Sequence, residues 1–327
     1  MIVDCHVHVI VPEITRDAAP GEAWRPLVRA EDGRQVVEMG GRAIRAVVHE
    51  FVDVEAILDQ RASAGIDHVV LSPLVTLLFG DAEPHEALER GRIQNAALAR
   101  IVRAHPGRVS ALGAVPLQDG ALAARELRAV MADGALAGVE VPALVGGTPL
   151  GDERFEPFWE AAEATGALVF IHPTTNGFPV PAMQELYLFN LVGNPMETTL
   201  TAAHMVLSGL LERHPRLRVL LAHGGGAVLA LRGRLRHGHA AVAAAGGRLS
   251  EGPDASLARL HYDTITHDPG LLAGVATFAG AERVLLGSDH PFDMADPDPV
   301  ATARAAGLDP DELGANAARL LGLGAVA

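Results

Sequence analysis

The chain is poor in several residue types that usually direct an interpretation. It contains one cysteine, Cys5, and no lysine, so all 26 of its cationic side chains are arginines. A single cysteine excludes an internal disulfide and fits a reducing cytoplasm, and we expect Cys5 to be a small buried apolar residue. Without lysine, a carbamylated lysine that bridges two metal ions is excluded as well.

Positive charge and long apolar runs are also scarce. The formal net charge of −14 argues against nucleic acid or an anionic membrane as a partner, because both require a basic surface. No apolar run reaches the length of a membrane span, and the N-terminus lacks the basic head and apolar stretch of a signal peptide. We therefore expect a cytoplasmic protein that binds an anionic ligand only where arginines gather.

Short apolar runs recur along the chain and alternate with helical stretches. The runs cover residues 1–9, 67–73, 108–116, 137–143, 167–173, 217–225, 260–266 and 283–292. Helical periodicity lies between most of them, as in residues 53–64, 85–104, 121–132 and 155–165. Runs of Val, Leu and Ile without polar alternation are typical of parallel strands buried on both faces. Eight such repeats predict an α/β fold in which the sheet closes as a (β/α)8 TIM-like barrel.

Two long segments depart from a minimal barrel. Residues from about 11 to 50 separate the first strand from its helix, and they predict a small, partly β insertion over the barrel mouth. Residues 173–197, rich in Pro, Gly, Asn and aromatic side chains, predict a wall of a substrate pocket. Because we find no fixed repeat and no linker, we expect a single domain over residues 1–327.

Histidines and one aspartate stand where the predicted strands end. His6 and His8 share one face of the first strand, since alternate residues of a strand point to the same side. His172, His223 and Asp289 end later strands, and in a barrel such ends converge on one mouth. A His-x-His pair alone, in a chain with fifteen histidines, is more often accidental; its place on the first strand favours a metal site.

This set of nitrogen and oxygen donors suits one divalent ion, Zn²⁺ first, with Mn²⁺ or Fe²⁺ chemically compatible. We assign His6, His8, His172 and Asp289 as its ligands and leave one coordination position for water. His223 is then the group beside that water. Because a zinc-bound water has a pKa of about 7, a neighbouring imidazole can take its proton at neutral pH.

Several segments together resemble the metal-dependent amidohydrolase superfamily, in the branch of 2-amino-3-carboxymuconate 6-semialdehyde decarboxylase. They are DCHVHV, GNPMETT, LERHPRLRVLLAHGGG, HYDTITHDP, GSDHPF and NAARLLGL, in the family's order and over nearly the full chain. The resemblance implies the same four ligands around a single metal ion, with His223 as the catalytic base.

The resemblance also implies substrate-binding residues. Arg45 and Arg234 stand where the family binds substrate carboxylates, and Arg234 would reach the neighbouring subunit, so a homodimer is implied. Phe292 matches an aromatic residue that packs on substrate. Asn190 and Asn194 depart from the family, which has a tryptophan and a methionine there, and they imply a more polar pocket for a small carboxylate.

Other polar residues near the predicted mouth have structural interpretations. Asp263, His267 and His290 can support the ligands, and Asp4 can either hydrogen-bond an imidazole or support the barrel floor. The glycines at 224–226 favour close backbone approach over phosphate binding. We expect surface or core roles for the remaining histidines, which are His49, His68, His85, His105, His204, His214, His237, His239 and His261.

Three functions remain open at this point. The first is non-oxidative decarboxylation of an unsaturated or aromatic carboxylic acid, with metal-bound water activated by His223. The second is hydrolysis of a cyclic amide, imide, lactone or C–C bond, for which Asp289 would donate a proton to the leaving group. The third is a binding protein that retains the barrel without catalysis, which an intact ligand set disfavours.

Overall fold

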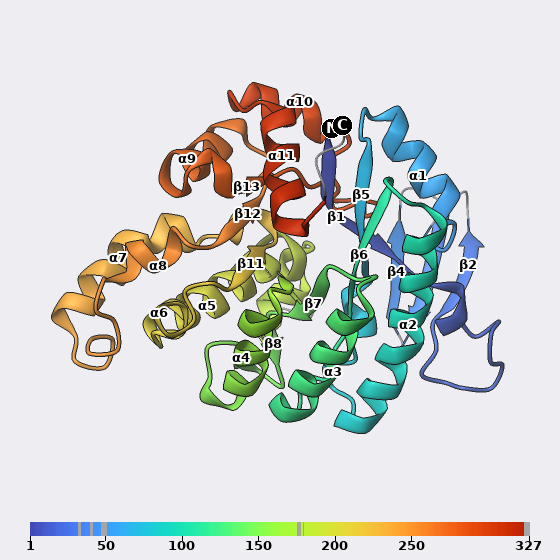
Figure 1. Ribbon diagram of the computed structural model, residues 1–327, viewed down its shortest axis with the longest axis horizontal. Coiled ribbons are helices and arrows are strands. Elements are labelled where there is room, and N and C mark those ends of the chain that lie inside the picture. Colours follow the sequence, from blue (N-terminus) through green and yellow to red (C-terminus); the bar gives the residue numbers. More distant parts are fainter. Residues whose placement is uncertain (32–33, 40–41, 47–50, 175–177, 179, 324–327) are drawn as a thin grey trace.

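The computed structural model describes residues 1–31, 34–39, 42–46, 51–174, 178 and 180–323, and for residues 42–46 the backbone alone. Eight parallel strands form one sheet whose spatial order follows the chain (Figure 1): β1 (Val3–Val9), β5 (His68–Pro73), β6 (Val109–Gly113), β7 (Gly138–Pro142), β10 (Leu168–His172), β11 (Arg218–Leu221), β12 (His261–Asp263) and β13 (Val284–Leu285). The last strand returns to the first, because the Cys5 N–H donates to the Leu286 carbonyl at 2.8 Å. The predicted (β/α)8 barrel is confirmed.

Helices cover the outside of the barrel, and the predicted ones begin and end within two residues of expectation. The α-helices are α1 (Val54–Ser63), α2 (Pro84–Ala104), α3 (Gly120–Asp133), α4 (Glu156–Thr165), α5 (Asn194–Leu207), α6 (Leu210–Arg213), α7 (Val228–Ala241), α8 (Pro253–Leu257), α9 (Pro269–Ala279), α10 (Pro299–Ala305) and α11 (Pro310–Leu321). Asp53, Asp119 and Asp268 start three of them by accepting hydrogen bonds from backbone N–H groups of the first turn. None of the helices in this part of the chain combines the length and apolar character that crossing a bilayer requires.

The segment between β1 and α1 forms a small antiparallel sheet, as predicted. Its strands are β2 (Leu27–Glu31), β3 (Arg34–Met39) and β4 (Arg42–Ala46). The Gln35 side chain accepts the Phe51 N–H, and Arg34 lies 3.6 Å from Asp293, which follows the last barrel strand. The insertion therefore reaches the same end of the barrel as the strand-end histidines. A short hairpin of β8 (Leu144–Val145) and β9 (Thr148–Pro149) follows β7.

The two larger apolar clusters of the described residues hold the barrel. The larger one packs the helices on the strands, with Phe158 and Trp159 of α4 fully buried in it. The smaller one contains Cys5, Phe170 and Leu220 together with Leu320 of α11. Because α11 also packs on β1 and β13, it closes the barrel at the end opposite the strand-end histidines. Cys5 is 1% exposed, which confirms the expected buried apolar role.

A buried histidine on β12 makes stability depend on pH. Burial, followed by the charge of Arg283, lowers the pKa of His261 to about 4, against about 6.5 in an unfolded chain. Between these values only the unfolded state takes up the proton, so stability falls as the pH drops from 6.5 to 4, by about 3 kcal/mol for this group. We expect His261→Gln to flatten that fall in urea unfolding measured over this window. Parallel curves for the two proteins would refute the effect.

Candidate metal centre

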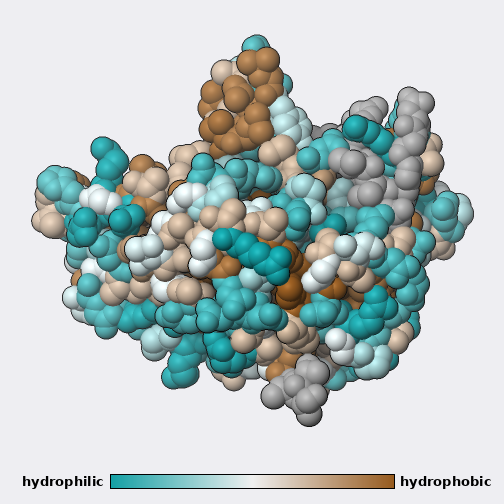
Figure 2. Space-filling view, turned by 90° about the horizontal axis from the view of Figure 1, so that it is seen from above, coloured by the Kyte–Doolittle hydropathy of each residue, from teal (hydrophilic) through white to brown (hydrophobic). Residues whose placement is uncertain are grey.

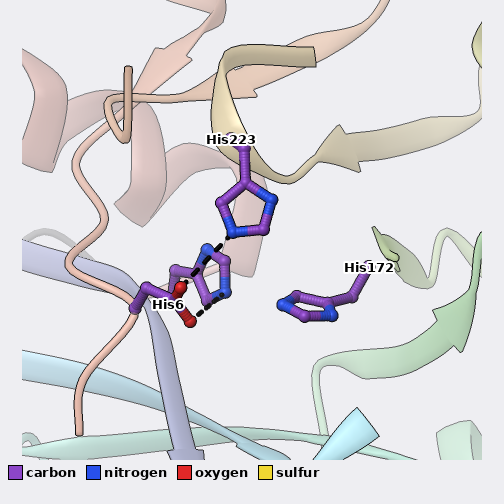
Figure 3. Close-up of side chains that lie close together, drawn as sticks. His6, His172 and His223 are labelled. Carbon is purple, nitrogen blue, oxygen red and sulfur yellow. Dashed lines mark hydrogen bonds and ion pairs between the residues drawn. The ribbon is translucent and has the colours of Figure 1, made fainter. Parts of the chain in front are cut away.

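Four histidines and one aspartate that the sequence singles out come together at the carboxyl ends of the barrel strands. His6 and His8 lie on β1 and His172 ends β10, whereas His223 opens the 3-10 turn η6 (His223–Gly225) after β11, and Asp289 follows β13. Figure 3 shows His6, His172 and His223 pointing toward one another from different elements. Ligand atoms of His6, His172, His223 and Asp289 all lie within 4.8 Å of each other.

The spacing of these atoms fits a cation. The Nε2 atoms of His6 and His8 are 3.0 Å apart, and Asp289 Oδ1 lies 3.2 Å from the first and 3.3 Å from the second. His172 Nε2 and Asp289 Oδ1 are buried without a hydrogen-bond partner among the described residues. Buried lone pairs that face one another are costly unless they share a proton or a metal ion. The imidazole and carboxylate donors present suit Zn²⁺, Mn²⁺ or Fe²⁺.

Outer hydrogen bonds turn each imidazole toward the centre. His8 Nδ1 donates to the Pro73 carbonyl at 3.0 Å, and His172 Nδ1 donates to the Pro173 carbonyl at 2.9 Å. His6 Nδ1 donates to Asp263 Oδ2 at 2.8 Å. Because an acceptor fixes the proton on Nδ1, the Nε2 lone pair of each ring is left for a metal ion.

Asp263, at the end of β12, organises this part of the site. It is fully buried and also accepts the N–H groups of His223 at 3.0 Å, Gly224 at 2.8 Å and Ile265 at 3.1 Å. Burial alone would raise its pKa, but the hydrogen bond and charge of His6 prevail and lower it, so the carboxylate stays ionised. The sequence placed Asp263 near the mouth, and the structure gives it His6 as its partner.

Replacing Asp263 by alanine tests this support. The His6 ring would lose its acceptor, and we expect metal affinity to fall about 10–100-fold, which is typical when an outer partner of a ligand is removed. Competition with a chelator of known affinity measures the change. An unaltered affinity in the folded variant would mean that Asp263 serves only the turn at Gly224.

The turn after β11 needs its glycines. Gly224 has φ +60°, and a Cβ atom there would lie 2.7 Å from the Thr266 side chain. At Gly226 a Cβ atom would lie 2.1 Å from the Pro195 carbonyl oxygen. The glycines therefore let two backbone segments crowd the mouth, as expected from the sequence. His223 itself has φ +56° and Asp289 φ +63°, a conformation that non-glycine residues adopt mainly where the surroundings impose it.

His223 differs from the other imidazoles. Its Nε2 atom lies 3.3 Å from Asp289 Oδ2, and its Nδ1 atom has no hydrogen-bond partner among the described residues. Its side chain is 16% exposed and lines the cavity, whereas the side chains of His6 and His8 are fully buried. Burial would raise the pKa of Asp289, but the charge of His6 and the hydrogen bond from His223 hold it well below its usual value. His223 is thus placed between the cation site and the cavity.

A cavity of about 310 Å³ adjoins the centre. It is lined by Leu74, Val75, Thr76, His172, Tyr187, Phe189, Asn190, Asn194, His223, Asp289, Phe292, Asp293 and Met294. The segment after β10 supplies four of these, so the predicted pocket wall is there. Thr76 Oγ1 and Asn194 Oδ1 are buried without a hydrogen-bond partner in the described chain. The Phe292 ring meets the His8 ring edge to face at 5.2 Å.

The described residues do not place either predicted arginine at this cavity. Arg45 lies on β4 opposite Val36, and its side chain is outside the described residues, as is the whole of His49. Arg234 is exposed on α7, which projects with α8 away from the barrel (Figure 1). Among the residues that the structure describes, no arginine lines the cavity.

The residues that the sequence predicted to support the ligands near the mouth differ in their positions and contacts. Asp4 accepts the Ser288 N–H at 3.0 Å and the Ser288 hydroxyl at 2.5 Å, so it joins β1 to the segment after the last strand. Its carboxylate has no hydrogen bond to an imidazole ring nitrogen of the described residues. His290 is buried, and its carbonyl accepts the His8 N–H at 2.8 Å; burial and Arg61 lower the pKa of its ring to about 3. His267 is exposed and lies outside the cavity lining.

Sequence reasoning missed Glu140 and Thr76. Glu140 lies in the apolar run of β7, and its ligand atom is within 4.8 Å of those of His8 and His172. A single charged residue inside an otherwise apolar strand is the signal that could have identified it. Thr76 stands in a short turn after β5, where nothing in the sequence distinguishes it from other turn residues.

Fold and site together define a TIM barrel with a candidate metal centre at its carboxyl-terminal mouth. The family model described as Amidohydrolase matches residues 3–323, and the chain belongs to this family. It is 29% identical over 297 residues to the 2-amino-3-carboxymuconate-6-semialdehyde decarboxylase of Dictyostelium discoideum, covering 89% of this chain and 82% of that protein. It is 27% identical over 238 residues to the gamma-resorcylate decarboxylase of a Rhizobium strain, covering 67% and 64%.

Solved structures of other proteins share this fold. The 5-carboxyvanillate decarboxylase of Sphingomonas paucimobilis superposes with a TM-score of 0.82 at 26% identity, covering 98% of both chains. A dihydroxybenzoic acid decarboxylase of Polaromonas, solved with bound manganese and the inhibitor 2-nitroresorcinol, has a TM-score of 0.77 at 20% identity, covering 98% and 97%. The resemblance drawn from the sequence is therefore confirmed for the family and the fold.

Proposed function

We propose that the protein is a metal-dependent, non-oxidative decarboxylase of a small aromatic or unsaturated carboxylic acid. The observation that carries the proposal is the convergence of three imidazoles and one carboxylate on a single point beside a cavity of about 310 Å³. Relatives and structural neighbours named as decarboxylases support it.

We assign His6, His8, His172 and Asp289 to hold one divalent ion. When bound, the ion supplies positive charge that orients a substrate anion and stabilises negative charge as it develops. Zn²⁺ and Mn²⁺ both suit the donor set, and manganese in a structural neighbour favours testing both. Loss of CO2 breaks the bond between the carboxylate carbon and the carbon that bears it, and a proton must then replace the carboxylate. We assign this proton transfer to His223.

The cavity indicates which groups the substrate carries. A buried polar atom without a partner costs about 1–3 kcal/mol, so Thr76 Oγ1 and Asn194 Oδ1 favour a ligand that hydrogen-bonds to them. Asn194 Oδ1 can only accept, which requires a hydroxyl or amino group on the substrate. Phe292 offers an aromatic surface on the same cavity. A hydroxylated or aminated acid of one ring, or its open-chain equivalent, matches these features.

We further propose that Arg234 binds the substrate carboxylate in the cavity of a second copy, and that Arg45 assists within the same chain. Exposed apolar side chains near the cavity support a homodimer, notably Leu186, Leu191 and Val192, and the face in Figure 2 carries a protruding apolar patch. Guanidinium forks suit carboxylates, and the lining described above contains none.

Mixing inactive variants tests Arg234 in trans. An Arg234→Ala protein and a His223→Ala protein should each be nearly inactive, because each lacks one part of every site. Mixed dimers carry one site in which both defects fall together and one site that is intact. We expect activity to return to about a quarter of the wild-type value in an equimolar, fully exchanged mixture, by random pairing. No recovery despite dimer exchange would exclude the action in trans.

The activity test is direct. Protein loaded with Zn²⁺ or Mn²⁺ is assayed for CO2 release from 2,6-dihydroxybenzoate, 5-carboxyvanillate, 6-methylsalicylate and 2-amino-3-carboxymuconate 6-semialdehyde. We expect turnover with at least one hydroxylated or aminated acid and none after metal removal. A metal-loaded protein that releases no CO2 from any of them would argue against decarboxylation.

The hydrolytic alternative is weaker on one specific ground. It needs Asp289 to donate a proton, whereas the surrounding imidazoles hold the pKa of Asp289 well below its usual value. Labelled oxygen from water in the product, without CO2, would favour hydrolysis. A folded protein that binds no metal ion would instead favour the non-catalytic interpretation.

A further inference from the structure

Glu140 is an isolated carboxyl group inside the barrel. It lies on β7 between Val139 and Val141, pairs in register with Phe170 of β10, and is 1% exposed. Neither of its carboxylate oxygens has a hydrogen-bond partner among the described residues. Burying a charged carboxylate without a partner costs several kcal/mol, so such a group is retained only where it is neutral or meets a cation.

The surroundings of Glu140 point to a cation. Its carboxylate lies within 4.8 Å of the ligand atoms of His8 and His172, on strands β1 and β10. It does not line the cavity, so a substrate there does not reach it. An ionised carboxylate at this place therefore requires additional positive charge beside it.

We propose that Glu140 is a fifth protein ligand of the same ion that His6, His8, His172 and Asp289 hold, an inference that rests on the proposed metal centre. The imidazole donors favour one ion over two. In His8 and His172 the Nδ1 atom donates to a backbone carbonyl, at 3.0 and 2.9 Å, so only Nε2 is available to bind a metal ion. Each ring can therefore bind one ion. His172 belongs both to the group with Glu140 and to the group with Asp289, so both groups would hold the same ion.

A fifth ligand changes which metal the site prefers. Zn²⁺ in catalytic sites usually takes three protein ligands and one open position, whereas Mn²⁺ favours more donors, with carboxylates among them. Two carboxylates also balance the charge of a divalent ion. The presence of Glu140 therefore favours Mn²⁺ or Fe²⁺ over Zn²⁺, relative to a site with Asp289 alone.

The test is Glu140→Gln, which keeps the shape of the side chain and removes its charge. In protein loaded with Co²⁺, visible absorption grows stronger as the number of ligands falls from six to five and from five to four. We expect the weak spectrum in the wild type, a stronger and shifted spectrum in the variant, and one ion per chain. We expect Mn²⁺ affinity to fall at least about 10-fold, because even outer partners of ligands contribute that much, and Zn²⁺ affinity to fall less.

Matched controls keep the result interpretable. Glu126→Gln removes another buried carboxylate, which pairs with Arg92 at 2.7 Å away from the site, and should leave the Co²⁺ spectrum unchanged. If Glu140→Gln does not fold, Glu140→Asp retracts the carboxylate and should weaken Mn²⁺ binding.

Two results would overturn the proposal: a Co²⁺ spectrum and Mn²⁺ affinity that are unchanged in either Glu140 variant, or two ions per wild-type chain. Absence of CO2 release with these metal results intact would contradict the decarboxylase proposal alone.

Discussion

Asp289→Asn is expected to abolish metal retention and CO2 release together. The Asp289 carboxylate approaches the Nε2 atoms of both His6 and His8, at 3.2 and 3.3 Å, and is the carboxylate that faces all the converging imidazoles. An asparagine keeps the size but loses the charge that holds a divalent ion. Losing the ion removes several kcal/mol of stabilisation of developing charge, so we expect a fall of about 10³-fold or more in kcat/KM.

The measurement has two arms. The number of metal ions per chain after dialysis against a weak chelator measures occupancy of the site. CO2 release from the best substrate measures the reaction. Asp81→Asn, in the exposed turn before α2, is the matched control and should behave as wild type in both. Full metal occupancy with normal turnover in folded Asp289→Asn would refute the ligand assignment, whatever the reaction proves to be.

Most of the fold could be predicted because the local signals agree with it. The helix expected over residues 53–64 spans Val54–Ser63, since Asp53 caps its first turn and apolar residues recur at helical spacing. The last two strands are shorter than their apolar runs, with three and two residues in place of seven and ten. There the runs continue past the sheet into the mouth, where the positive φ of Asp289 turns its carboxylate toward the imidazoles.

The converging residues could be predicted for a topological reason. In a barrel the ends of all strands share one mouth, so position at a strand end suffices to bring distant residues together. That logic does not reach residues inside the strands, and Glu140 was missed because its neighbours in GVEVP are apolar. It does not reach irregular turns either, so Thr76 entered the site only through the coordinates. The hydrogen bond from His6 to Asp263 likewise depends on the position of β12 between β11 and β13, which the sequence does not show.

His223→Gln is expected to lower kcat by about 10²–10⁴-fold, the range typical of losing a general acid or base, while the metal ion stays bound. His6, His8 and His172 each have an outer acceptor that fixes Nδ1, whereas His223 Nδ1 has no partner in the described chain. A ring held in this way, with part of its surface exposed to the cavity, suits proton transfer better than permanent coordination. His267→Gln, exposed and outside the lining, is the control and should retain wild-type kcat.

Metal content decides between two roles that the geometry allows for His223. Its ligand atom lies within 4.8 Å of those of His6, His172 and Asp289, so it could replace His8 around the ion. If His223→Gln loses the ion, His223 is a ligand and His8 the candidate for another role. If the ion stays and turnover falls, the proton-transfer role holds. If both ion and turnover are unchanged, His223 serves neither purpose, and the proton that replaces the carboxylate must come from another group on the cavity wall.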